Sequence, residues 1–251
     1  MEDLLHVLLI RHIPAGLIIN IARQTQLLRH LSHHQQHLVG ADGGNSIVRR
    51  TFFAPPKKQY VAIQEYFPDT CTNLPHYSCI FDPETSDSCS WTIRKDGYWV
   101  FGGAFDKNNC RTAFEQQKSR LTSYLGINPG DPIKREACLL TSIRDARDFI
   151  LGKDRVFLLG EAAGFVSPSS FEGFSSAFLS GKYLADAFAV CTDARSILRH
   201  YKRNTWKLRL KLLCKIPKMR ILCSPFLRGL IMRSGIRSIQ KYSEKGCLAK
   251  K

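Results

Sequence analysis

The sequence predicts a mixed α/β fold that combines a layer of parallel strands, an antiparallel sheet and a C-terminal helical tail. Three observations predict it. First, two short apolar strands, within residues 37–50 and 155–164, end in glycine-rich turns. Second, residues 60–105 alternate between polar and apolar side chains, as strands do. Third, the chain is basic and has a helical pattern from Arg199 onward. With 251 residues, 44% of them apolar, the chain can bury the core of one large domain or two small ones.

The first glycine-rich turn lies in HLVGADGGNSIVRR, residues 37–50. This segment is typical of the end of a strand, a tight turn and the start of a helix.

The central stretch predicts an antiparallel sheet. Its strand-like runs are YVAIQEYF, HYSCIF, CSWTIRK and GYWVFGGAF, and turn signals separate them. Asp96-Gly97 favours a tight hairpin turn between the last two runs. A helix is expected over residues 111–125.

The second turn follows RVFLLG, residues 155–160, an apolar run without alternation, as in a parallel strand buried on both faces. Glu161 comes directly after it and can accept hydrogen bonds from vicinal hydroxyls. The small residues that follow let a bulky ligand approach the backbone, and a helix over 173–190 would direct its N-terminal N–H groups toward an electron-rich ring. A ribityl chain with an isoalloxazine ring needs these features, although tight packing between a strand and a helix also explains either turn alone.

Both turns carry a family resemblance. GADGGNSIVRR, at Gly40–Arg50, resembles the Asp-Gly motif of FAD-dependent hydroxylases and reductases. LLGEAAGFVSPSSFEGFSSAFLSG, residues 158–181, resembles the second FAD motif of the geranylgeranyl reductase family. The sequence is more similar still to the CbrA-type flavoproteins of that family, over roughly residues 37–240. The resemblance implies a Rossmann-like FAD/NAD(P)-binding layer, here partial, with FAD as the cofactor.

The resemblance also implies site residues. Asp42 and Gly43 match the pair that lies beside the cofactor's pyrophosphate and ribose, and Glu161 takes the place of an aspartate that contacts ribityl or ribose hydroxyls. Arg49 or Arg50 would assist the phosphates, with an exposed surface arginine as the alternative. The remaining cofactor-binding candidates belong to the turn after the second strand and to the loop, 168–173, that would face the flavin ring: Gly160, Ala162, Gly164, Pro168 and Gly173.

A substrate-site motif of the family, Tyr-x-Trp-x-Phe-Pro-Lys, is only partly kept. CSWTIRK matches it at Trp91 and Lys95 and departs from it at other positions, so these two residues are the substrate-binding candidates. For Trp91, Tyr98 and Trp99 the favoured interpretation is that they are strand aromatics that pack in a core. The sequence assigns no proton donor or other catalytic side chain, and no metal ligand.

The G-x-G-x-x-G turn with which relatives of this family open is absent. LLIRHIPAGLIINIAR comes nearest to it but has Arg11 and Ile13 where glycines would sit, and LIINIARQTQLLRHLS also matches a later helix of the family. We therefore expect a truncated or rearranged dinucleotide-binding half and weak flavin binding.

The charge lies almost entirely in the tail. Of the formal net charge of +16, residues 199–251 carry +15 and residues 1–198 carry +1. An amphipathic basic helix is expected, with cations at Arg203, Lys207, Lys211, Lys215 and Lys218 and an apolar arc of Trp206, Leu210, Leu212, Leu213 and Ile216. Such a helix can dock on its own domain with a solvated charged side, or bind an anionic membrane surface; nucleic acid is not expected, because no recognised binding fold surrounds the basic run.

Nine scattered cysteines without a C-x-x-C pair predict reduced thiols and no zinc cluster. The N-terminus is a poor signal peptide, and no apolar run reaches 18 residues. We expect a cytoplasmic protein that can associate peripherally with the inner face of the membrane.

These observations divide the chain into four expected parts. They are a remnant of the FAD-binding domain (1–50), the antiparallel substrate domain (51–150), a segment that returns to the FAD-binding domain (151–198) and the basic helical tail (199–251). The resemblance implies an FAD-dependent oxidoreductase that reduces C=C bonds of an apolar, isoprenoid substrate. The alternatives are an FAD-dependent aromatic hydroxylase, or a catalytically inactive fragment of such a flavoprotein at a membrane surface.

Overall fold

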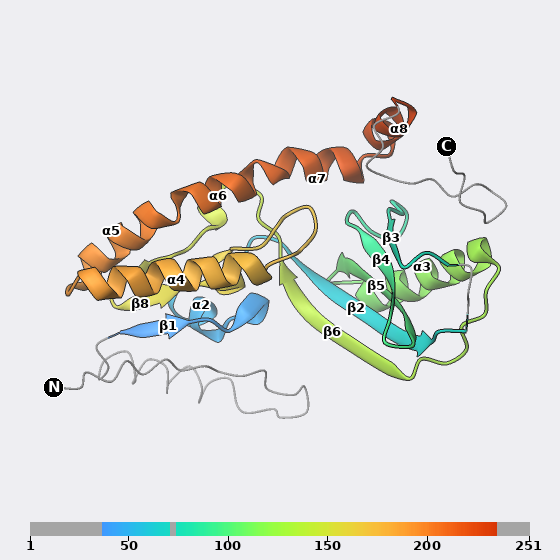
Figure 1. The fold of residues 1–251 in the computed structure, drawn as a ribbon, viewed down its shortest axis with the longest axis horizontal. Coiled ribbons are helices and arrows are strands. Elements are labelled where there is room, and N and C mark those ends of the chain that lie inside the picture. Colours follow the sequence, from blue (N-terminus) through green and yellow to red (C-terminus); the bar gives the residue numbers. More distant parts are fainter. Residues whose placement is uncertain (1–36, 71–73, 235–251) are drawn as a thin grey trace. The chain divides into compact units, whose positions relative to one another are not determined.

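The computed structural model describes residues 37–70 and 74–234 and divides the chain into two compact units (Figure 1). We call the first the motif unit; it comprises Met1–Gln59 and Leu139–Ile216. The second, the sheet unit, comprises Tyr60–Cys138 and Pro217–Lys251. Each unit has its own hydrophobic cluster, as the sequence length allows.

The motif unit contains a small sheet with two parallel strands. Strand β1 (Leu38–Gly40) pairs in parallel with β8 (Val156–Leu158), and β7 (Gly152–Lys153) pairs antiparallel with the other side of β8. All residues of β1 and β8 are buried, which confirms the parallel strand expected from its unbroken apolar run.

Helices surround this sheet. Helix α2 packs on β1 and β8, and α4 packs on α5 and on the turn that follows β8. Among the described residues of this unit, the helices are η1 (Gly43–Asn45), α2 (Ile47–Phe52), η2 (Ala146–Asp148), η3 (Gly160–Ala163), α4 (Phe174–Val190), α5 (Ala194–Asn204), α6 (Trp206–Leu213) and α7 (Lys215–Cys223). Helix α7 crosses the boundary between the units. The expected helix over 173–190 is confirmed as α4.

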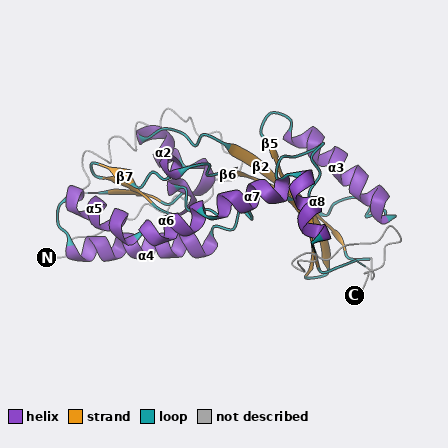
Figure 2. Cartoon of the chain, turned by 90° about the horizontal axis from the view of Figure 1, so that it is seen from above, coloured by secondary structure: helices purple, strands orange, loops and turns teal. Residues whose placement is uncertain are grey.

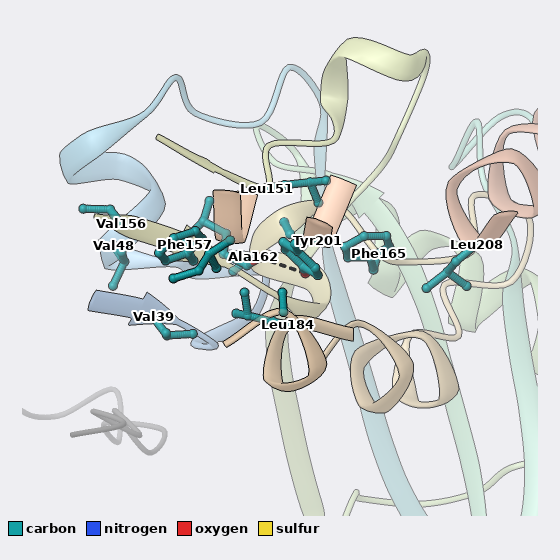
Figure 3. Packing of buried hydrophobic residues seen from close by; sticks show 14 of the residues in the cluster. Val39, Val48, Leu151, Val156, Phe157, Ala162, Phe165, Leu184, Tyr201 and Leu208 are labelled. Carbon is teal, nitrogen blue, oxygen red and sulfur yellow. Dashed lines mark hydrogen bonds between the residues drawn. The ribbon is translucent and has the colours of Figure 1, made fainter. Parts of the chain in front are cut away.

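Side chains from the strands, the turn after β8 and the last helices meet in one core (Figure 3). Phe157 of β8, Leu184 of α4 and Leu208 of α6 are among them. Tyr201 of α5 is completely buried, and its hydroxyl donates to the carbonyl oxygen of Leu158 at 3.1 Å. The first part of the basic tail is therefore an integral part of the motif unit's core.

The sheet unit is built on five strands in the order β3-β4-β5-β2-β6. Their bounds are β2 (Gln59–Pro68), β3 (Tyr77–Ile80), β4 (Ser90–Lys95), β5 (Tyr98–Asp106) and β6 (Lys134–Thr141), and β3–β4, β4–β5 and β2–β5 pair antiparallel, as expected. Asp96 and Gly97 both have positive φ angles, of 52° and 77°, which confirms the tight hairpin turn.

Helix α3 (Cys110–Leu125) packs on β5, and α8 (Pro225–Arg233) also belongs to this unit (Figure 2). The aromatic core beneath α3 includes Trp99, Phe101 and Phe114, so Trp99 is a core residue. No helix among the described residues is both long enough and apolar enough to cross a bilayer.

Candidate functional site

The parallel pairing of β1 and β8 brings the two glycine-rich turns to one edge of the small sheet. Gly40 and Leu158, the last residues of the two strands, are register partners. The Asp-Gly turn follows β1 and the Gly-Glu turn follows β8, so both leave the sheet at the carboxyl ends of neighbouring parallel strands. In open α/β sheets this edge is where ligands bind.

The two turns touch at Gly44. A Cβ atom at this position would lie 2.5 Å from the carbonyl oxygen of Leu139 and 2.6 Å from Glu161 Oε1. Such distances leave no room for a side chain, and a main-chain oxygen cannot move aside easily. Glycine at position 44 is therefore required for the contact between the two motifs.

Glu161 lies at the centre of this contact. Its Oε1 accepts a hydrogen bond from the main-chain N–H of Thr141 at 2.6 Å. Burial raises the pKa of the Glu161 carboxyl above its ordinary value, and the Thr141 hydrogen bond only partly opposes the shift. Glu161 Oε2 has no hydrogen-bond partner among the described residues, and so remains available as an acceptor.

Among the described residues, two side chains at the end of β6, where the Thr141 N–H bonds to Glu161, lack hydrogen-bond partners. Thr141 and Ser142 are each 1% exposed, and the hydroxyls of both are buried without a hydrogen bond within the part of the chain that the structure describes. Buried hydroxyls without partners are uncommon in folded proteins and call for an explanation. The sequence did not single out these residues, because a Thr-Ser pair at the end of a strand has no distinctive pattern.

Asp42 stabilises the start of α2. Its carboxylate accepts from the Ser46 hydroxyl at 2.5 Å and from the Ile47 N–H at 2.6 Å. Gly43 has a φ of +73°, and nothing lies within 4 Å of the position that a Cβ would take. The backbone at Gly43 is therefore open to a ligand, whereas the carboxylate of Asp42 orders the turn from within.

Buried hydrogen bonds of Arg49 link the Asp-Gly motif to the turn after β8. It is 2% exposed, and its guanidinium donates to the carbonyl oxygens of Ala162 at 3.0 Å and Asp148 at 3.1 Å. Burial lowers the pKa of Arg49, although the charge of Asp148 partly opposes this shift. The alternative of an exposed surface arginine is wrong for Arg49, because main-chain carbonyls that no sequence pattern reveals hold it inside the protein. The exposed neighbour, Arg50, bonds to the Asn45 side chain.

The turn after β8 depends on two glycines. Gly160 and Gly164 have φ angles of +59° and +92°, in the left-handed region that favours glycine. The Gly160 N–H donates to the Ser180 hydroxyl of α4 at 2.9 Å, which holds the helix against the turn. Ala162, between the two glycines, is buried.

The 168–173 loop closes on itself before α4 begins. The Phe171 N–H donates to the Ser167 carbonyl oxygen, and the Ser167 N–H donates to the Glu172 carbonyl oxygen, both at 2.9 Å. Phe171 has a φ of +53°, which is unusual for a bulky residue. Pro168 is buried, and Gly173 precedes α4 without a capping side chain.

The two substrate-binding candidates lie in the sheet unit. Both residues lie in β4, where successive side chains alternate between the two faces of the sheet. Trp91 and Lys95 therefore point to the same face, and the buried Thr92 points to the other. The indole of Trp91 lies against Gly102 of β5, where a Cβ would be 2.6 Å from the indole Nε1. Within this unit the two residues therefore share one face of the sheet.

A hydrogen-bonded network lies on neighbouring strands. The Tyr66 hydroxyl and the Gln64 amide both donate to Glu136 Oε2 at 2.8 Å, and Lys134 pairs with the other oxygen of that carboxylate. These hydrogen bonds, that of Lys134 first, lower the pKa of Glu136 to about 2. The sequence analysis missed this network, because its members are far apart along the chain.

A separate cavity of about 910 Å³ lies between β3, β4 and α3 of the sheet unit. Its lining includes Ile80, Trp99, Gln117 and Leu121. None of the residues that the sequence analysis singled out for FAD or substrate binding lines it.

No family model matches the sequence. Among curated proteins, the chain is 42% identical over 210 residues to the protein CbrA of Escherichia coli O6:H1 (strain CFT073). The alignment covers 83% of this chain and 56% of that protein, so the chain spans little more than half the length of this relative.

Two solved structures show the same fold. A geranylgeranyl bacteriochlorophyll reductase-like protein of Thermoplasma acidophilum superimposes with a TM-score of 0.61 and 14% identity, over 84% of this chain and 57% of that one. PqsL of Pseudomonas aeruginosa, described as a probable FAD-dependent monooxygenase, superimposes with a TM-score of 0.54 and 14% identity, over 79% of this chain and 59% of that one. At these identities the likeness establishes the fold, and it confirms the α/β class expected from the sequence.

Proposed function

Because this chain belongs to the family of the CbrA proteins and has the fold of FAD-dependent oxidoreductases, we propose that it binds FAD and acts as an FAD-dependent oxidoreductase. The descriptions of the two solved structures support the cofactor and the reaction class, and the turns of the motif unit are the proposed site. The chain covers 56% of its CbrA relative, so the activity of the whole relative enters here only as part of the proposal.

The observation that carries the proposal is the meeting of the Asp-Gly and Gly-Glu turns at the carboxyl ends of two parallel strands. There Glu161 Oε2 has no hydrogen-bond partner among the described residues. A ribityl or ribose chain offers several hydroxyls in a row, and each can both donate and accept. Glu161 therefore fits the sugar part of a flavin, and the open backbone at Gly43 fits its phosphates.

When bound, FAD supplies hydride transfer to or from a substrate. The residues of the chain orient the cofactor: Glu161 accepts from a sugar hydroxyl, and Gly160 and Gly164 let the chain turn without a side chain toward the ligand. Trp91 offers an apolar surface for a substrate in the sheet unit, and Lys95 offers a charge on the same face of the sheet.

The preferred reaction is reduction of a C=C bond in an apolar, isoprenoid substrate. It is supported by the partly kept substrate motif around Trp91 and by the fold shared with the reductase-like protein. The second candidate is aromatic hydroxylation, and it is favoured by the fold shared with PqsL.

Product analysis separates the two reactions. The chain is supplied with FAD, a reductant and a prenylated phenol, which offers both C=C bonds and an aromatic ring, once without oxygen and once with oxygen present. A reductase gives a product that gains two hydrogen atoms in both cases, whereas a hydroxylase gives a product that gains one oxygen atom and only with oxygen. A folded, flavin-loaded chain that forms neither product would contradict the enzymatic part of the proposal and leave the binding part standing.

A further inference from the structure

Helices α5 and α6 present one continuous buried stripe to the motif unit. Its members recur every three or four residues, and none is more than 8% exposed: Ile197, Tyr201, Thr205, Leu208 and Leu212. Four of the five belong to the hydrophobic core of the unit. This spacing fixes the rotation of both helices, so their other side lies outside the core.

That other side carries a dense positive charge. Six exposed cations lie on it: Arg195, Arg199, Lys202, Arg203, Lys207 and Lys211. Within the described part of the chain, no carboxylate lies within ion-pair distance of any of them. Asp193 is the acidic residue nearest to these cations in the sequence. Its carboxylate accepts a hydrogen bond from the Ser196 N–H at 2.9 Å and caps α5. Six unpaired like charges repel one another unless a negative partner compensates them.

The same side also exposes two large apolar residues. Trp206 and Leu210 are each 50% exposed and lie one helical turn apart. The Nζ of Lys207 is 5.9 Å from the centre of the Trp206 ring. The sequence analysis expected one apolar arc that held Trp206 and Leu210 together with Leu212. The structure divides this arc, because Leu212 packs in the core with Leu208 whereas Trp206 and Leu210 are exposed. We call the six cations with Trp206 and Leu210 the basic face.

We propose that the basic face binds an anionic lipid surface, with α5 and α6 lying in the plane of the membrane interface. Proteins at membrane interfaces commonly combine cations with an exposed tryptophan. The cations pair with lipid phosphates, and the indole inserts at the level of the headgroups. The exposed side chain of Leu210 favours lipid over nucleic acid as the partner. An acyl layer removes this side chain from water, whereas a phosphate backbone satisfies the cations and leaves Leu210 exposed.

The first test is binding of the full chain to vesicles. The chain binds vesicles that contain phosphatidylglycerol, does not bind phosphatidylcholine vesicles, and is released by high salt. Lys207→Glu with Lys211→Glu lowers the partition coefficient at least about 30-fold, since each basic residue contributes roughly a factor of five. The matched control, Lys153→Glu with Arg155→Glu, makes the same change of net charge at exposed positions of the β7–β8 turn and lowers binding far less. An equal loss in the control would overturn the assignment to the basic face.

The second test locates the insertion. Vesicles with brominated acyl chains quench tryptophan fluorescence at the depth of the bromines. Measured in a Trp91→Phe background, Trp206→Phe removes most of the quenching, because the tryptophan that is left, Trp99, is 2% exposed and packed in the core of the other unit. Circular dichroism confirms that each variant is folded. Unchanged quenching in Trp206→Phe would overturn the proposal, and so would tighter binding to duplex DNA than to anionic vesicles.

Discussion

Burial of the Glu161 side chain disfavours the ionised form of its carboxyl. Burial raises the pKa of its carboxyl, so the folded chain holds this proton to higher pH than the unfolded chain does. The free energy of unfolding therefore falls as pH rises from the ordinary glutamate pKa through the raised one. Flavin binding is the role that we propose for a carboxyl whose ionised form is disfavoured by burial.

Glu161→Gln separates the cost of this charge from its function. Glutamine can still accept from the Thr141 N–H and does not titrate, so the variant without flavin is more thermostable than the wild type at neutral pH. The two melting temperatures converge as pH falls below the ordinary glutamate pKa. Flavin affinity falls about 10- to 100-fold, since a charge-assisted hydrogen bond to a sugar hydroxyl is lost. Melting curves from pH 4 to pH 8 and flavin titration check both parts; a variant that loses stability at neutral pH contradicts them.

Gly44 tests the contact between the turns. Gly44→Ala places a Cβ 2.5 Å from the Leu139 carbonyl oxygen, and we expect a loss of about 1–3 kcal/mol in the free energy of unfolding. The control is Gly43→Asn, because the neighbouring position has open space and asparagine tolerates its positive φ. Urea unfolding measures both; equal losses in the two variants would mean that the contact has no special role.

At the scale of elements, Arg49 joins α2 to the turn after β8. Arg49→Lys keeps the charge but cannot reach three carbonyl oxygens in different directions, those of Ala54, Ala162 and Asp148. We expect a loss of about 2–4 kcal/mol, since a buried charge is left without partners. Arg50→Lys, at the exposed neighbour, changes stability by less than about 0.5 kcal/mol. Chemical denaturation distinguishes them, and a phosphate-binding role without a structural one predicts unchanged stability for both.

Several elements could be predicted from the sequence because local chemistry decides them. Asp96-Gly97 specifies its own turn, and the unbroken apolar run before Gly160 specifies a strand buried on both faces. The rotation of α6 could not be predicted. In WKLRLKLL, apolar residues occupy positions on all sides, so the pattern permits either Leu208 and Leu212 or Trp206 and Leu210 in the core.

Part of the candidate site could likewise be predicted from the sequence, and part could not. Glu161 and the glycines could be predicted, because a turn at a strand end requires particular residue types. Thr141 and Ser142 could not, since only the fold brings the end of β6 beside the Gly-Glu turn. The buried position of Arg49 could not be predicted either, because its partners are main-chain carbonyls.

At the scale of the whole molecule, the motif unit combines the candidate cofactor site with the basic face, and both depend on its core. Tyr201, Leu208 and Leu212 belong to this core, so removal of residues 199–251 would unfold the unit rather than isolate the tail. Charge substitutions on the surface are therefore the means of testing the basic face.

The central claim is that the turns after β1 and β8 form a flavin site, and a flavin titration of the purified chain tests it most directly. We expect the chain to be purified with less than one flavin per molecule and to bind one added flavin saturably. FMN and FAD bind with similar affinity, because the sequence has no G-x-G-x-x-G turn for the pyrophosphate and the contacts around Glu161 serve the sugar next to the ring. Glu161→Gln weakens the binding of both. If the folded wild-type chain binds no flavin, or if Glu161→Gln binds it as tightly as the wild type, the account is contradicted.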